Sequence, residues 1–136
     1  MTRVLLISLV AVALGAGAAS AQTQVKKAPI KQTSPVDAKA MYKNYCAACH
    51  GADGKGNGPA ASALKTAPAD LTKISARNGG TFPDTKVKRY IQGLDEVPAH
   101  GSRDMPMWGD LFGSLNRDTI EIRVNNLSEY IKSLQQ

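Results

Sequence analysis

Three residues in the run Cys46-Ala47-Ala48-Cys49-His50 have types and spacing suited to chemistry. A Cys-x-x-Cys-His sequence is the attachment signature for haem c. Two intervening residues put both sulfurs on one helical turn, where each thiol can add across one vinyl group of the porphyrin. His50 follows in a position to give an imidazole nitrogen to the iron from the same side. The motif therefore predicts one covalent haem c, with thioethers from Cys46 and Cys49 and a proximal ligand from His50.

Other uses of a cysteine pair fit this sequence less well. A structural zinc site normally needs four Cys or His ligands. Besides the two cysteines the chain has only His50 and His100, and His50 directly after Cys49 fits ordinary zinc spacings poorly. A thioredoxin-like pair would need a preceding strand within an α/β pattern, which is absent here. A disulfide between Cys46 and Cys49 would close a very short loop and stabilise little. The zinc, redox dithiol and disulfide alternatives remain open, but haem attachment is favoured.

The other side of the iron would need a ligand from elsewhere in the chain. Ala99 to Gly113 is rich in Gly and Pro and is predicted to be a loop, yet it holds two methionines, the single tryptophan and a phenylalanine. Such an apolar loop must cover something, and a haem face is a good candidate. Met105 and Met107 are the two candidates for a distal ligand, which would make the iron six-coordinate and raise its potential. Either methionine could instead fill a gap in the core.

The roles expected for three other residues of this loop are less specific. Trp108 is expected to lie over the porphyrin edge as a core aromatic. Arg103 either pairs with a haem propionate or is a solvated loop residue. His100 is interpreted as an ordinary loop histidine, with a propionate contact or misligation as alternatives.

Gly51 to Pro59 is a glycine-rich loop directly after the motif. It lacks the order of a phosphate-binding loop and no strand precedes it. The glycines would let the backbone pass close to the porphyrin edge. The carbonyl of Pro59 is expected to accept the other ring N–H of His50, which would fix its tautomer.

Helical patterns surround these motifs. A first helix is predicted from a Ser34 cap through Cys49, and a second from a Thr81 cap to Gly93. A third begins at an Asn116 cap and follows an apolar stripe to Leu134, and it should pack against the first. Short helical turns are expected between residues 60 and 78. No strand pattern appears, so the predicted class is all-α, with three to five helices around one haem.

The ends of the chain divide it into three parts. Residues 1–21 have a basic start, an apolar run and an Ala-Ser-Ala cleavage site, which predict a cleaved signal peptide. Residues 22–33 are polar and basic and are interpreted as a flexible leader. Residues 34–136 would form one small domain. Export through the inner membrane predicts a periplasmic protein, without a membrane span once the signal is removed.

In sequence the chain resembles the class I monohaem cytochromes c from Pro35 to Gln136. The resemblance rests on four runs: C-A-A-C-H-G, G-x-G-N-G-P, M-P-M-W, and a final helix ending L-S-E-Y-I-K-S-L. It implies that the methionine directly before a proline, Met105, is the distal ligand, with Met107 as its rival. It also implies that Pro59 bonds His50, and that Tyr130 supplies an aromatic contact between the first and last helices, with Ala38 as the small partner.

These observations together predict electron transfer rather than catalysis, and no catalytic residue is assigned. The net charge of +6 favours a soluble carrier that docks transiently on redox partners with acidic surfaces. Lys55, Lys65 and Arg103 are the basic residues expected around the haem edge. Nucleic acid is not expected to be a partner, because the basic residues form no run. The alternatives are a haem c subunit of a periplasmic dehydrogenase or oxidase complex, and an enzyme or gas sensor with five-coordinate haem.

Overall fold

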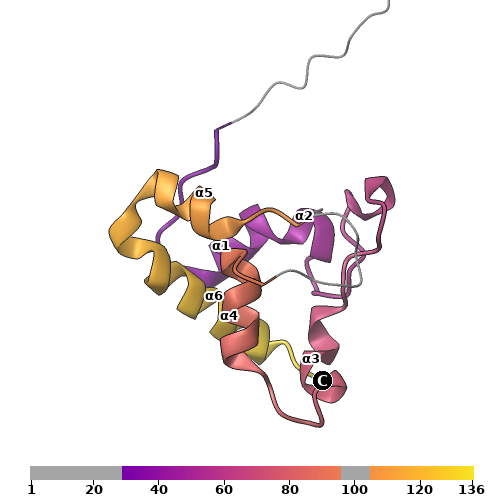
Figure 1. Cartoon of the computed structure of the whole chain (residues 1–136). Coiled ribbons are helices and arrows are strands. Elements are labelled where there is room, and N and C mark those ends of the chain that lie inside the picture. Colours follow the sequence, from indigo (N-terminus) through magenta and orange to yellow (C-terminus); the bar gives the residue numbers. More distant parts are fainter. Residues whose placement is uncertain (1–28, 96–104) are drawn as a thin grey trace, which may run out of the picture.

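The structure is a computed structural model that describes residues 29–95 and 105–136. Within these two segments the chain is helical and contains no strand, which confirms the all-α prediction (Figure 1). The described α-helices are α1 Ala38–Tyr45, α2 Ala47–His50, α3 Ile74–Arg77, α4 Asp84–Gln92, α5 Trp108–Leu115 and α6 Ile120–Ser133. Three 3₁₀ turns lie between them: η1 Ala61–Ala63, η2 Leu71–Lys73 and η4 Arg117–Thr119. Six helices exceed the three to five expected because α2 and α3 are single turns.

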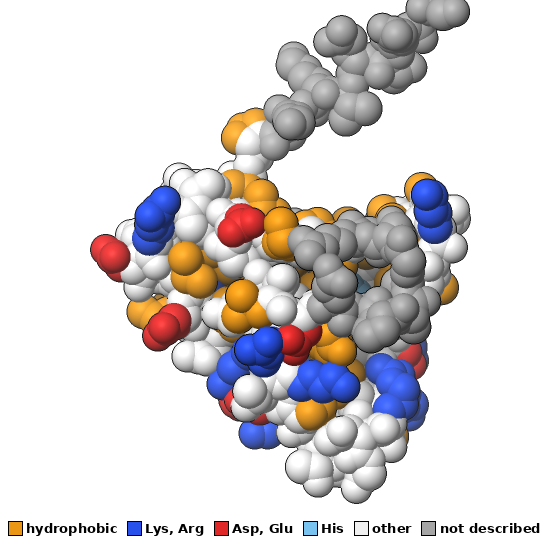
Figure 2. Space-filling view, viewed as in Figure 1, with side chains coloured by type: hydrophobic (Ala, Val, Ile, Leu, Met, Phe, Trp, Pro, Cys, Tyr) orange, Lys and Arg blue, Asp and Glu red, His pale blue; other side chains and the backbone are white. Residues whose placement is uncertain are grey.

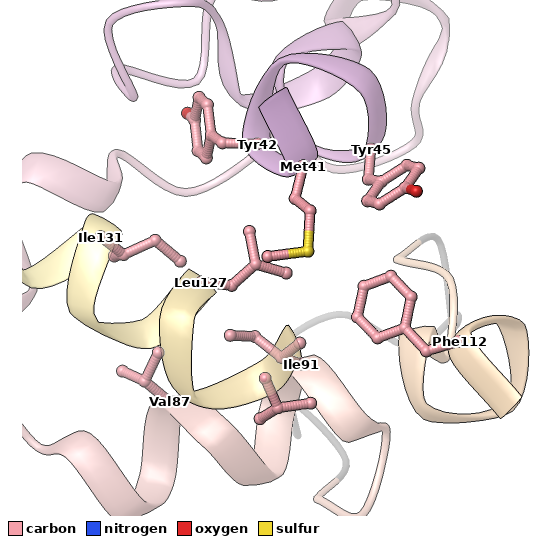
Figure 3. Close-up of a cluster of buried hydrophobic side chains, with 9 residues drawn as sticks. Met41, Tyr42, Tyr45, Val87, Ile91, Phe112, Leu127 and Ile131 are labelled. Atoms are coloured by element: carbon pink, nitrogen blue, oxygen red, sulfur yellow. The ribbon is translucent and has the colours of Figure 1, made fainter. Parts of the chain in front are cut away.

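Helix α6 packs against both α1 and α4, and α5 lies against α4 and α6. The apolar stripe of α6 buries Val124, Leu127 and Ile131 between these helices. Figure 3 shows Leu127 and Met41 meeting at the centre of the core, with Tyr45 and Phe112 beside them. The buried apolar side chains are Met41, Tyr42, Tyr45, Val87, Ile91, Phe112, Val124, Leu127 and Ile131. The predicted contact between the first and last helices is therefore confirmed.

An aromatic pair joins these two helices. The rings of Tyr42 on α1 and Tyr130 on α6 lie 5.1 Å apart between centroids. The hydroxyl of Tyr42 donates to the carbonyl of Gly51 at 2.8 Å. Tyr42 thus connects α6, α1 and the residue that follows His50, and burial raises the pKa of this phenol above its ordinary value.

Two of the predicted helix caps were placed too early. Asp37, not Ser34, caps α1, because its carboxylate accepts the backbone N–H of Ala40 at 2.9 Å. Helix α4 follows Pro83 rather than Thr81. The predicted end of α4 at Gly93 is confirmed: Gly93 has φ +79° and its N–H bonds the carbonyls of Arg89 and Tyr90.

The prediction of a loop up to Gly113 was wrong, because Trp108–Leu115 forms helix α5. The two glycines that suggested a loop lie inside this helix. A Cβ at Gly109 would lie 2.8 Å from the carbonyl oxygen of Gln92, so this glycine allows α5 to approach the end of α4 closely. Phe112, buried on α5, supplies the apolar contact that offsets the weak helix propensity of glycine.

Asn116 follows α5 and caps the next turn, since its side chain accepts the N–H of Asp118 at 2.9 Å. This turn, η4, leads directly into α6. None of the helices within residues 29–95 and 105–136 has the length and apolar character to cross a bilayer.

Candidate functional site

The attachment motif lies where α1 ends and α2 begins. Cys46 is the junction residue, and its N–H still bonds the carbonyl of Tyr42 at 2.9 Å. Cys49 and His50 lie on the single turn α2. Both cysteines are free thiols, and both line the same cavity as His50. The structure thus brings the three predicted motif residues together at one wall.

The Cys46 thiol lies in an environment that disfavours its charged form. Burial, and after it the nearby charge of Cys49, raises the pKa of Cys46 to about 12. The Cys46 thiol is therefore protonated at neutral pH. In the described residues, no group of three or more Cys, His, Asp or Glu side chains is arranged to hold a metal ion, so the protein alone provides no tetrahedral zinc site there.

The ring of His50 is held by a different carbonyl from the one predicted. Its Nδ1 lies 3.0 Å from the carbonyl oxygen of Ala69, and among the described residues no hydrogen bond joins it to Pro59. Desolvation by burial lowers the pKa of His50, against the opposing effect of this hydrogen bond. The neutral imidazole that results is the form that binds metals.

The glycine-rich loop explains why Pro59 lies elsewhere. Its backbone caps the end of α2: Gly56 N–H bonds the His50 carbonyl at 2.8 Å, and Gly58 N–H bonds the Cys49 carbonyl at 3.0 Å. Ala60 N–H likewise bonds the carbonyl of Ala48 at 2.9 Å. Pro59 therefore lies between Gly58 and Ala60, which both donate to carbonyls of α2. The carbonyl of Ala69, further along the chain, reaches the His50 ring instead.

A cavity of about 740 Å³ lies in front of the motif. Its lining combines the motif with apolar side chains of the core, including Val87, Ile91, Leu127 and Ile131. Leu64, Leu71 and Ile74, the apolar residues of the segment where only short turns were expected, form another part of the wall. Such a volume falls within the roughly 300–1,000 Å³ of typical cofactor sites.

The predicted methionine segment also reaches this cavity. Met105, Pro106, Met107 and Trp108 all line it. The exposed fractions of Met105 and Met107, 38% and 37%, do not separate the two. Their surroundings do, because Met107 lies over Gly93, where an added Cβ would come within 2.6 Å of Met107 Cγ. Met107 is therefore packed on the end of α4.

Trp108 lies at the cavity as an aromatic wall. Its ring centroid is 5.3 Å from that of Tyr45 and 5.7 Å from that of Phe112. Arg103 and His100 lie outside the described residues, as do the signal peptide and most of the leader. Their expected roles stay predictions.

Charged side chains at the cavity differ from those expected. Arg77 and Lys86 line it, as does Asp95, which forms an ion pair with Arg89 at 2.6 Å. Lys55 and Lys65 are exposed but do not belong to the lining. Figure 2 shows Lys and Arg side chains gathered over the α3–α4 part of this face.

Several residues that line the site were not assigned to it from the sequence. The Ala69 carbonyl belongs to the backbone, so residue type does not mark it. Tyr45 lines the cavity, and its place directly before Cys46 was the available clue. Arg77 and Lys86 stand among many basic residues, and only their positions in α3 and α4 distinguish them.

The family model described as Cytochrome c matches residues 35–135. No curated protein and no solved structure gives a significant match. The matched range contains every residue that lines the cavity.

Proposed function

The chain belongs to the cytochrome c family, and from this premise we propose that it carries electrons in the periplasm through one haem c with His50 and Met105 as axial ligands. Family membership implies covalent haem c, which supplies a one-electron couple between ferric and ferrous iron. The observation that carries the proposal is that Cys46, Cys49, His50 and Met105 line the same cavity.

The donor set of the cavity fits haem c. Two thiols, one imidazole and one thioether are the groups needed for two covalent attachments and two axial bonds. The remaining wall is largely apolar, as a porphyrin plane requires, with Arg77 and Lys86 available for anionic groups at its edge. In this assignment Cys46 and Cys49 form the thioethers.

The hydrogen bond of His50 supports its role as proximal ligand. If Nδ1–H donates to the Ala69 carbonyl, the lone pair is on Nε2, which is then available for a metal. The same bond fixes the orientation of the ring. The Ala69 carbonyl therefore takes the part that the sequence assigned to Pro59.

Met105 is favoured over Met107 as the distal ligand by packing. The side chain of Met107 lies against Gly93. The backbone carbonyl of Met107 accepts the N–H of Leu111 at the start of α5. Met105 directly precedes Pro106 and lines the cavity. Two axial side chains leave no open iron position, which suits electron transfer and disfavours the enzyme or gas-sensor alternative.

The location and the partner class complete the proposal. The predicted signal at residues 1–21 supports export, which cell fractionation would test. Arg77 and Lys86 at the cavity, and the net charge of +6, favour docking on a redox partner with an acidic surface. A subunit of a dehydrogenase or oxidase complex would use the same haem site, and co-purification with a large partner distinguishes it from a free carrier.

Electron transfer between the haem protein and an acidic redox protein tests the carrier role. We expect the second-order rate to fall steeply as salt rises from about 10 to 200 mM, because salt screens charges separated by more than about 10 Å. Lys86→Gln should lower the low-salt rate several-fold, while Lys39→Gln, outside the cavity lining, serves as the matched control. A rate independent of salt and of Lys86 would contradict docking at this face.

A further inference from the structure

Arg123 on α6 is a buried cation, with 5% of its surface exposed. In the described part of the chain no carboxylate forms an ion pair with it. Its guanidinium instead donates to neutral acceptors: Nη2 to the Thr33 carbonyl at 2.8 Å, and Nη1 to Thr33 Oγ1 at 3.1 Å. Nε reaches Thr119 Oγ1 at 3.3 Å, and the ring of Phe112 lies 5.8 Å from the guanidinium carbon. Burying a charge on neutral partners is costly, so these bonds require an explanation.

The hydrogen bonds continue from Thr33 to α1. Thr33 Oγ1 and the Tyr45 hydroxyl lie 2.7 Å apart, and the Tyr45 hydroxyl donates to the Lys31 carbonyl at 2.7 Å. One set of proton positions satisfies the whole chain, in which Arg123 donates to Thr33, Thr33 to Tyr45 and Tyr45 to Lys31. Hydrogen bonds in such a series strengthen one another, and the charge of Arg123 starts the series.

We call residues 30–35 the N-terminal strap. In addition to the bonds at Thr33 and Lys31, the strap is bound at Pro35, whose carbonyl accepts from the side-chain amide of Asn126 on α6 at 2.9 Å. Ile30 packs against the core. In Figure 1 this indigo segment joins the body of the molecule near α1 and α5. The part of the leader closest to the domain is thus attached to α1 and α6, where the sequence suggested only flexibility.

Tyr45 connects the strap to the haem site. It lines the cavity directly before Cys46, and its ring lies 5.3 Å from Trp108 and 5.5 Å from Phe112. Figure 3 shows the rings of Tyr45 and Phe112 next to one another. Trp108 directly follows the methionine segment and opens α5. The hydroxyl end of Tyr45 is therefore held by the strap, and its ring is held against the residue that follows Met107.

We propose that the N-terminal strap is a positioning element for the distal side of the haem, in which Arg123 and Thr33 fix Tyr45, and Tyr45 fixes Trp108 and the Met105–Met107 segment. This inference rests on the proposed function, because it takes Met105 as the distal ligand. None of the strap residues lines the cavity, so the strap acts on it through the residues that it binds, above all Tyr45. When the strap is released, the methionine segment detaches more often and external ligands reach the iron.

Cyanide binding to the ferric haem protein tests the proposal. Thr33→Val and Tyr45→Phe each remove one hydroxyl and keep the shape of the side chain. We expect each to accelerate cyanide binding about 3- to 10-fold and to weaken the iron–methionine absorption band. The double variant should equal Tyr45→Phe, because that change alone removes both bonds of the Tyr45 hydroxyl, to Thr33 and to Lys31. The control is Asn44→Ala on the same helix, which removes a bond to the Ala40 carbonyl and leaves the strap intact. Rates equal to wild type in both hydroxyl variants would overturn the proposal.

Replacing Arg123 itself, for example by Met, would test the proposal but risks preventing folding. A mature chain shortened to begin at Ser34 removes Lys31 and Thr33 instead and gives a second test. We expect its cyanide rate to match or exceed that of Thr33→Val, and an unchanged rate would again overturn the proposal. Emission of Trp108, the single tryptophan, is quenched by a nearby haem and does not depend on the distal ligand. If the wild-type spectrum shows no methionine ligation, the assignment of Met105 as ligand is wrong, and Trp108 emission alone tests the positioning role of the strap. A rise of this emission in the strap variants supports that role, and unchanged emission overturns it.

Discussion

Single residues position the haem ligands mainly through backbone contacts. Gly58 is buried, and a Cβ there would lie 2.3 Å from the Ala48 carbonyl and 2.6 Å from that of Ala47. This close approach lets its N–H reach the Cys49 carbonyl and close the end of α2. The position of Cys49 and His50 therefore depends on the absence of a side chain at Gly58, eight or nine residues further along the chain.

Gly58→Ala should destabilise the haem protein by about 1–3 kcal/mol, the usual cost of overpacking a tight site. Guanidinium chloride unfolding of the ferric protein, followed in the haem absorption, measures this. Gly113→Ala is the matched control, because its Cβ would meet only Ile120 Cδ1 at an ordinary 3.5 Å. Equal stabilities of the two variants would contradict the role of Gly58.

At this scale the sequence predicts side chains well and backbone partners poorly. Cys46, Cys49, His50 and Met105 were all expected at the site, because thiol, imidazole and thioether chemistry is visible in residue type. The carbonyl that holds His50 was assigned to Pro59 and is that of Ala69. A carbonyl belongs to every residue, so its partner depends on the path of the loop, which residue types alone do not determine.

Among the helices, α6 organises the site by contacting α1, α4 and α5. Its stripe was predicted because apolar residues recur at helical spacing. Helix α5 was not, since Gly109 and Gly113 carry poor helix propensity. Tertiary packing overrides that propensity: Gly109 is needed where α5 meets Gln92, and Phe112 is fully buried.

A hydrogen bond between α4 and α6 should make stability depend on pH. The buried Ser128 hydroxyl donates to the Asp84 carboxylate at 2.7 Å. Desolvation alone would raise the pKa of Asp84, but hydrogen bonds from Lys88 and Ser128 outweigh it and the pKa lies below its ordinary value. A carboxyl with a lowered pKa in the folded state stabilises it above the unfolded pKa of about 3.9, and this contribution is lost as pH falls through the folded pKa.

Ser128→Ala should therefore lower the free energy of unfolding by about 1 kcal/mol at pH 7, a modest value because a third of the Asp84 side chain is exposed. The difference from wild type should shrink as pH falls below about 4, the unfolded pKa, and through the lower pKa of Asp84 in the folded state. Denaturant unfolding at several pH values measures both. Ser133→Ala, which removes an exposed hydroxyl bond on the same helix, should show neither effect. A Ser128→Ala difference that does not decrease with falling pH would contradict the assignment.

The whole molecule is a small all-α domain whose core forms one wall of its cavity. Val87, Ile91, Leu127 and Ile131 belong to both, so the empty cavity would expose core surface to water. Small domains commonly need a staple in addition to their apolar core. The covalent haem is the expected staple here.

Removing the haem should therefore unfold much of the chain. Cys46→Ser with Cys49→Ser prevents covalent attachment, and this variant should show much weaker far-ultraviolet helical dichroism than the haem protein and no cooperative thermal transition. The haem-containing wild type is the reference. A well-ordered double variant that unfolds cooperatively would show that the polypeptide core is sufficient.

The proposed haem c is six-coordinate, with His50 and Met105 as its two protein ligands to iron. The most direct test is the visible spectrum of the periplasmically expressed protein, oxidised and reduced, with and without carbon monoxide, for wild type, Met105→Ala and Met107→Ala. We predict a c-type reduced spectrum, a weak iron–methionine band when oxidised and no carbon monoxide shift for wild type and Met107→Ala. Met105→Ala should lose the band and bind carbon monoxide. A wild-type spectrum that shifts with carbon monoxide, or a band that survives in Met105→Ala, would contradict the claim.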